Sequence, residues 1–148
     1  MDHKFSINRI RLIEAHFALN LKYKWEKDAK IEIHHSIEIK HKNDDKILNV
    51  LVSISSNSDK QPFHFTVAWE GMFAFQKMPE KDALERIAQI NCASIIFPYL
   101  RESIADLTRR ASIAPLNINP TNFVALFEEK HKAATQKPVK KKNYNHDK

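Results

Sequence analysis

Four segments in the first part of the chain alternate between apolar and polar residues, which is the pattern of half-buried β-strands. Between residues 31 and 41 the isoleucines fall on one face, and residues 48–54 and 63–75 repeat this alternation. Polar residues suited to turns separate these runs at 43–45 and 55–59. The pattern therefore predicts strands that are joined by tight turns.

The first predicted strand, about residues 5–19, has an irregular alternation. Its apolar residues occupy odd positions up to Ile7, even positions at Ile10 and Leu12, and odd positions again from Ala15. A β-bulge or a change of the buried face produces such a slip, because side chains along a strand alternate with a period of two. We expect at least one irregularity in this strand.

The spacing of apolar residues changes to a helical period after residue 79. Pro79 suits a first helical turn and acidic residues follow it, as the helix dipole favours. An apolar stripe then runs from Leu84 to Ala111, and Pro98 within it predicts a kink or a division of the helix. Residues 115–120 predict an extended connector.

A short last helix is predicted after the connector. Thr121 or Asn119 is the expected cap, and the helix carries Phe123, Leu126 and Phe127. Strands followed by helices indicate an α+β fold. The predicted architecture is a four-stranded antiparallel sheet, then a long kinked helix, then a short C-terminal helix.

The net charge of +6 would suit nucleic-acid binding if it were spread over the fold. Residues 130–148 carry seven lysines and one acidic residue, however, so this segment alone accounts for the excess. We therefore predict a neutral domain over residues 1–129 and a basic, disordered tail over residues 130–148. A nucleic-acid-binding module that uses this tail remains an alternative function.

The sequence offers little catalytic chemistry. It contains one glycine, Gly71, which excludes a glycine-rich phosphate loop, and one cysteine, Cys92, which excludes an intrachain disulfide. Cys92 is expected to be a small buried apolar residue, with a reactive thiol as the alternative. His35 and His41 share a strand face but lie about 20 Å apart, too far for one metal. We expect no enzyme activity, no cofactor and no metal.

Apolar runs long enough to cross a membrane and the features of a signal peptide are both missing from the sequence. We therefore expect a cytoplasmic protein without membrane insertion. Its apolar residues exceed what one small sheet and two helices can cover, because the helix layer has an outer side. Association of copies would cover that layer.

Two motifs between residues 95 and 127 carry a family resemblance. The first has Phe97, Pro98 and Tyr99 followed by Arg101-Glu102, and the second runs from Pro115 to Phe127 with the pattern Pro-x-x-x-x-Pro-x-Asn-Phe-x-x-Leu-Phe. Together they resemble the SecB family, whose members are tetrameric chaperones that hold unfolded proteins without ATP. The resemblance implies unfolded polypeptide clients and a homotetramer built as a dimer of dimers.

The resemblance also implies functional positions. In the family, the loop after the first strand and the last helix border a client-binding groove, which makes candidates of Leu21, Tyr23, Trp25, Phe123 and Phe127, although each could equally be a core residue. Residues that match Phe65, Val67 and Trp69 support tetramer assembly in the family.

The sequence departs from the family at the acidic patch that meets the SecA motor ATPase. Of three matching positions only Glu14 is acidic, and Ala18 and Thr66 occupy the others. The family's acidic tail is also replaced by a basic one. The leading hypothesis is a chaperone that keeps preproteins competent for export, with Glu14 as a SecA contact. The alternative is a SecB-like chaperone dedicated to one client, such as the antitoxin of a toxin–antitoxin system.

Overall fold

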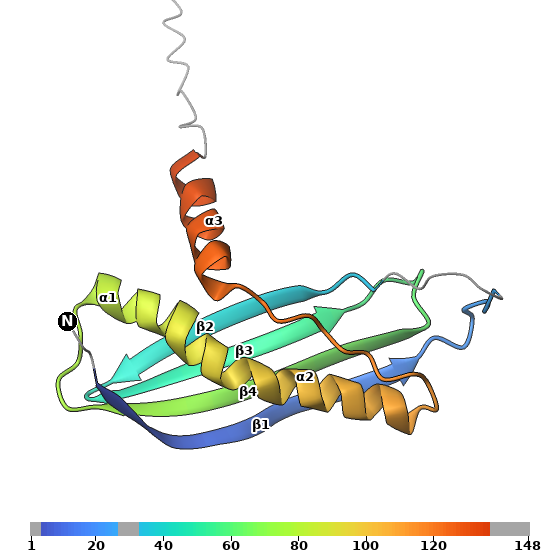
Figure 1. Cartoon of the computed structure of the whole chain (residues 1–148), viewed down its shortest axis with the longest axis horizontal. Helices are drawn as coiled ribbons and strands as arrows, with labels where there is room; N and C mark the ends of the chain where they lie inside the picture. Colours follow the sequence, from blue (N-terminus) through green and yellow to red (C-terminus); the bar gives the residue numbers. More distant parts are fainter. Residues whose placement is uncertain (1–3, 27–32, 137–148) are drawn as a thin grey trace, which may run out of the picture.

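A computed structural model gives the structure of the protein and describes residues 4–26 and 33–136. One antiparallel sheet forms the first layer, in the spatial order β1-β4-β3-β2 (Figure 1). Its strands are β1 (Phe5–Leu19), β2 (Ser36–Asp44), β3 (Ile47–Ser56) and β4 (Phe63–Phe75). The second layer contains α1 (Lys81–Arg86), the π-helical η1 (Ile87–Cys92) and α2 (Ala93–Arg110), and α3 (Phe123–Gln136) follows. The predicted α+β architecture is confirmed.

The irregular alternation of β1 arises from two shifts of register against β4. One lies between Ile7 and Arg9 and the other between Leu12 and Glu14. Each shift inserts an extra residue and so moves the apolar positions from odd to even or back. The two bulges keep Ile7, Leu12 and Phe17 on the face of the sheet that α2 covers, as the slip in the sequence predicted.

The helices η1 and α2 cross one face of the sheet obliquely and pack on β3 and β4 (Figure 1). Side chains four residues apart along α2, namely Ile96, Leu100 and Ile104, are buried in one core cluster with strand residues such as Val52 and Phe65. This spacing places them on one helix face. The core of the protein therefore lies between α2 and the two central strands.

The predicted division of the long helix at Pro98 is wrong. Pro98 lies inside α2, and the irregular segment is η1, which precedes it. Pro98 and Ser94, whose carbonyl would otherwise accept the missing hydrogen bond, are both exposed. Water can therefore satisfy that carbonyl, and the helix continues through the proline.

The long helix ends in a left-handed turn that reverses the chain. Ser112 has a φ of 59°, and the amide of Ile113 donates a hydrogen bond of 3.1 Å to the carbonyl of Thr108. This is the Schellman pattern, here with serine instead of the usual glycine. The following connector runs back beside α2, where Arg101 Nε donates to the carbonyl of Ile118 at 2.7 Å.

The last helix begins at Phe123 and points away from the sheet (Figure 1). Its cap is Asn122, not Thr121 or Asn119, because the Asn122 side-chain oxygen accepts from the amide of Ala125 at 3.1 Å. The helix extends to Gln136, so its end passes the predicted start of the tail at residue 130. Residues 137–148 of that tail lie outside the described part of the chain.

Gly71 lies beneath α2, where there is no room for a side chain. A Cβ at this position would lie 2.6 Å from a ring carbon of Phe73 and 2.9 Å from Cδ1 of Ile96. We predict that Gly71→Ala lowers the free energy of unfolding by about 1–3 kcal/mol, because the core must move to accept the methyl group. Urea denaturation measures the change.

Ala74→Ser on the opposite face of β4 is the matched control, with an expected change within about 0.5 kcal/mol. Equal stability of Gly71→Ala and the parent protein would contradict the tight approach of α2 to β4.

Candidate functional site

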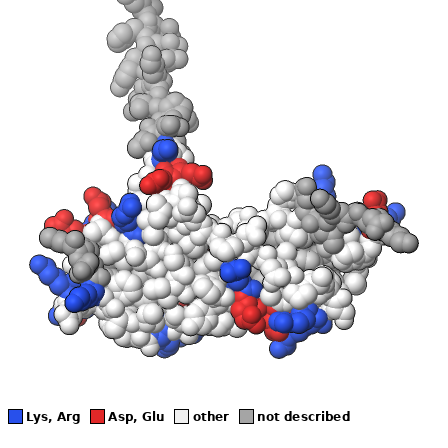
Figure 2. All heavy atoms as spheres, viewed as in Figure 1, with Lys and Arg blue, Asp and Glu red and all other residues white. Residues whose placement is uncertain are grey.

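An uncovered apolar face remains beside α2, because the helix covers the central strands and leaves much of edge strand β1 exposed. Ile7 and Leu12 of β1 are 49 % and 47 % exposed, and Tyr99 of α2 is 42 % exposed. We call these three residues the β1–α2 face. Figure 2 shows this side of the molecule with a broad uncharged area, with charged side chains at its two ends and with one group of acidic and basic side chains at the lower right of centre. Such a face is typical of a surface that binds another protein.

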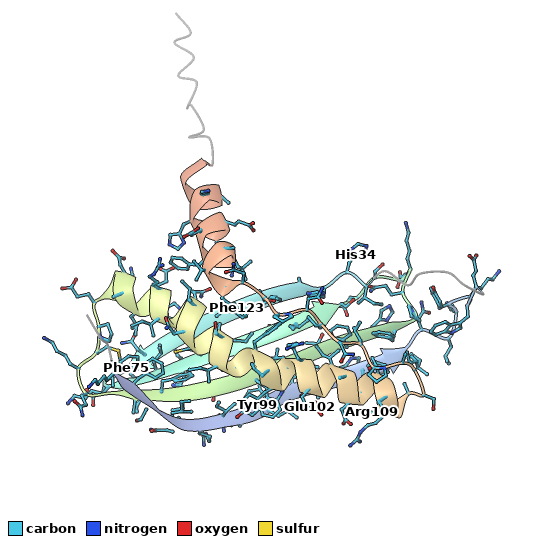
Figure 3. All side chains as sticks on the ribbon, viewed as in Figure 1. His34, Phe75, Tyr99, Glu102, Arg109 and Phe123 are labelled. Atoms are coloured by element: carbon cyan, nitrogen blue, oxygen red, sulfur yellow. The ribbon has the colours of Figure 1, made fainter. Side chains whose placement is uncertain are left out.

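Trp69 lies at the inner margin of the β1–α2 face. Its ring centroid is 5.1 Å from that of Tyr99, and its indole Nε1 donates to Ser103 Oγ at 2.9 Å. It pairs across the strands with Leu12. Tyr99 projects from the side of α2 that faces β1, with Glu102 and Arg109 further along the helix (Figure 3). Trp69 thus links the sheet to the exposed edge of the helix.

Phe65 and Val67, the other two candidates for oligomer contact, are fully buried in the protomer's own core. Their side chains are occupied by contacts within the chain. A role of these two residues in assembly stays a prediction, and it would act through the shape of the core beneath α2. Charged substitutions there would unfold the protomer instead of testing an interface.

The three candidates in the connection after β1 are clustered near its start. Leu21 and Trp25 are exposed, Trp25 at 58 %, and Tyr23 is half-buried. The rings of Tyr23 and Trp25 meet edge to face with centroids 5.2 Å apart. Apolar and aromatic side chains that cluster on the surface can bind an apolar segment of another chain.

The two candidates in α3 have different surroundings. Phe123 is buried, with its ring centroid 5.3 Å from that of Phe97 in α2. Phe127 is half-buried between the Arg86 guanidinium, 5.6 Å from its ring centroid, and the His131 ring, 4.0 Å away. It also lines a cavity of about 310 Å³ together with Ile39, Glu85, Gln89, Lys130 and His131. Phe123 attaches α3 to the body, whereas Phe127 is accessible.

The structure does not bring the five candidates into one groove. Residues 20–26 follow β1 at one end of the sheet, and α3 rises from a different part of the molecule (Figure 1). Within the part of the chain that the structure describes, the candidates form two surfaces. One contains Tyr23 and Trp25, and the other contains Phe127.

The face of the sheet opposite α2 lacks a concentrated negative charge. Glu14, Ala18 and Thr66 all lie on this open face, as their pairing with Ala68, His64 and His16 shows. Glu70, an acidic neighbour on the same face, is paired with Arg11 at 3.1 Å. Of the three matched positions, only Glu14 is therefore acidic, and the charge of the nearby Glu70 is offset by Arg11.

The environment of Cys92 does not support the alternative of a reactive thiol. Cys92 is buried, and burial raises the pKa of its thiol to about 12, so the thiol stays protonated at neutral pH. No group of three potential metal ligands occurs within residues 4–26 and 33–136. Among the helices described, none is long and apolar enough to cross a membrane.

Comparison with known proteins agrees with this arrangement of strands and helices. A family model for the preprotein translocase subunit SecB matches residues 11–134. The chain belongs to the SecB family. It is 33 % identical over 109 residues to a protein-export protein SecB of Thiobacillus denitrificans, covering 72 % of this chain and 71 % of the relative. It is 40 % identical over 81 residues to the SecB of Aromatoleum aromaticum, covering 55 % of this chain and 50 % of that relative.

A solved SecB-family structure shares the fold. It is the Mycobacterium tuberculosis SecB-like chaperone Rv1957 in complex with a peptide from the antitoxin HigA1. The TM-score is 0.67 at 19 % identity, over 78 % of this chain and 89 % of that one. At this identity the likeness concerns the fold.

Sequence reasoning missed Ile7, Leu12 and Tyr99 as surface candidates. The alternation of β1 indicated that Ile7 and Leu12 face inward, and Tyr99 belongs to the family motif. Their exposure follows from the strand order, which makes β1 an edge strand that α2 only partly covers. Strand order depends on long-range pairing, and local periodicity contains no information on it.

Proposed function

We propose that the protein is an ATP-independent chaperone that binds unfolded preproteins and keeps them competent for export. Membership of the SecB family supports this proposal, and the observation that carries it is the exposed Trp25, whose ring meets the half-buried Tyr23 edge to face in the connection after β1. The proposed clients are unfolded polypeptides with apolar segments. The activity needs no catalytic group and no cofactor, and we place it in the cytoplasm.

Such a chaperone acts by mass action. A protein that binds the unfolded state, and not the folded state, reduces the fraction of client chains that can fold or aggregate. Several binding surfaces on one assembly would increase the avidity for one long client, because later contacts form within the same complex. The surfaces around Trp25 and Phe127 are the proposed contacts, and Leu21 and Tyr23 extend the first of them.

The proposed assembly is a homotetramer, a dimer of dimers, in which the β1–α2 face is covered by another copy. Two arguments support this assignment: the apolar exposure of Ile7, Leu12 and Tyr99, and the open edge of β1. An exposed edge strand with an apolar face would otherwise favour uncontrolled association.

A second candidate is a SecB-family chaperone dedicated to one client, such as an antitoxin. The open sheet face supports it, since Ala18 and Thr66 stand beside Glu14 where an acidic patch is expected of export chaperones. A basic segment of SecA would meet less complementary charge here, which slows association and weakens binding.

The client surfaces are tested by aggregation suppression without nucleotide. We predict that the parent protein suppresses aggregation of an unfolded precursor at near-stoichiometric ratios. Trp25→Ala should weaken client binding about tenfold, because large exposed aromatic residues dominate such contacts. Phe127→Ala tests the second surface in the same way.

Ser53→Ala on the open sheet face is the control and should bind the client normally. Undiminished binding by both aromatic variants would place the client site elsewhere on the protein. Failure of the parent protein to suppress aggregation would contradict the chaperone function itself.

The assembly face is tested by Leu12→Asp. An aspartate there would be buried without a partner in the proposed interface. The dissociation constant of the assembly should therefore rise by about tenfold or more. Light scattering over a range of concentrations measures the mass. Ser53→Asp puts the same charge on the opposite face and should leave the mass unchanged. Equal masses for both variants would exclude the β1–α2 face as the interface.

The choice between export and a dedicated client is tested by titration with the carboxyl-terminal zinc segment of SecA at physiological salt. The export proposal predicts micromolar binding that Glu14→Lys weakens. Suppression of aggregation without measurable SecA binding would instead support the dedicated chaperone.

A further inference from the structure

The strand order forces the connection between β1 and β2 to cross the end of the sheet. β1 and β2 are the two edge strands, and β4 and β3 lie between them. The turn that joins β3 to β4, residues 57–62, occupies that same end. The connection therefore begins and ends near this turn, and Asn20 and His34, in its described ends, both form hydrogen bonds with residues of the turn.

Asn20 attaches the start of the connection to the turn. Its side-chain Nδ2 donates to the carbonyls of Asp59 at 3.0 Å and Gln61 at 2.9 Å, and its amide donates to the carbonyl of Pro62 at 2.8 Å. The Asn20 carbonyl accepts from the amide of Tyr23 at 3.1 Å. Asn20, held by the β3–β4 turn, thus fixes the turn that contains Tyr23.

Gln61 and Ser56 attach the other end of the connection at His34. The His34 amide donates to Gln61 Oε1 at 2.7 Å, Gln61 Nε2 donates to Ser56 Oγ at 2.7 Å, and Ser56 Oγ donates to the His34 carbonyl at 2.6 Å. The three hydrogen bonds form a closed ring. Gln61 and Ser56 are 1 % and 2 % exposed.

A buried ring of this kind is sensitive to the loss of any member. Each polar group in it is satisfied by the next, and removal of one leaves others without a partner away from water. Leucine has nearly the volume of glutamine and could fill the same space at residue 61. The polar atoms of Gln61 are therefore needed for the hydrogen bonds and not for packing. The ring and the Asn20 hydrogen bonds together attach Asn20 and His34, at the two described ends of the connection, to the same turn.

We propose that Asn20, Ser56 and Gln61 form a clasp that positions Tyr23 and Trp25 for client binding. The clasp consists of positioning residues that do not themselves contact the client. Because it holds the turn from Asn20 to Tyr23 in place before the client arrives, less conformational entropy is lost on binding. This inference rests on the proposed chaperone function.

The test compares Gln61→Leu with the parent protein, both labelled with 5-fluorotryptophan. The protein contains two tryptophans, and Trp25→Phe assigns their ¹⁹F resonances. The clasp predicts that Gln61→Leu narrows the Trp25 resonance through increased motion and leaves the Trp69 resonance unchanged. Affinity for reduced, carboxymethylated α-lactalbumin, a permanently unfolded probe, should fall about threefold to tenfold at unchanged assembly mass.

Val50→Ala is the matched control for stability. Val50 is buried in β3 and forms part of the core. Val50→Ala should lower the melting temperature without changing the Trp25 resonance or the probe affinity. Loss of affinity in this control to the same extent as in Gln61→Leu would reduce the clasp to a general effect of stability and overturn the proposal.

An unchanged probe affinity in Gln61→Leu, with or without a narrower Trp25 resonance, would also overturn it. A parent protein that does not bind the probe contradicts the proposed function instead, and the Trp25 resonance then tests the clasp separately.

Discussion

The structure depends on one constraint: a four-stranded sheet with an apolar face is wider than the single helix that covers it. The oblique α2 covers the central strands β3 and β4, whose inward-facing side chains are nearly all buried, and Gly71 permits this close approach. The apolar side chains of edge strand β1 are left half-exposed. The two bulges of β1 keep these residues on the helix side. The exposed side chains of Ile7 and Leu12 therefore lie on one face of the strand, beside α2.

This constraint separates two kinds of surface. The β1–α2 face is continuous with the core and suits a permanent partner such as another copy of the chain. The Tyr23–Trp25 pair lies on a connection outside the core, and it is held by polar contacts to the turn between β3 and β4. A transient client can be bound there without competing with the residues proposed to hold the assembly together.

Much of the fold could be predicted because its signals are local. The period of two along β3 and β4, the helical stripe after residue 84 and the slips in β1 each reflect one element and its neighbour. Local patterns were insufficient where tertiary contacts decide. Pro98 does not divide the helix because its site is exposed, and the cap of α3 is Asn122 because its side chain accepts a hydrogen bond from the amide of Ala125.

The candidate positions came from a family resemblance, and the structure distributes them over a core and two separate surfaces. Phe65, Val67 and Phe123 are buried, and only their neighbours in space could reveal that.

Clients are proposed to bind at the connection after β1 and at α3, while the β1–α2 face serves assembly. Hydrogen–deuterium exchange of the protein, with and without an unfolded client, distinguishes these two kinds of surface. We expect slower amide exchange on client binding within residues 20–26 and the accessible part of α3, with little change along β1 and α2. Slower exchange on the open sheet face, with no change in residues 20–26 or α3, would show that clients bind elsewhere.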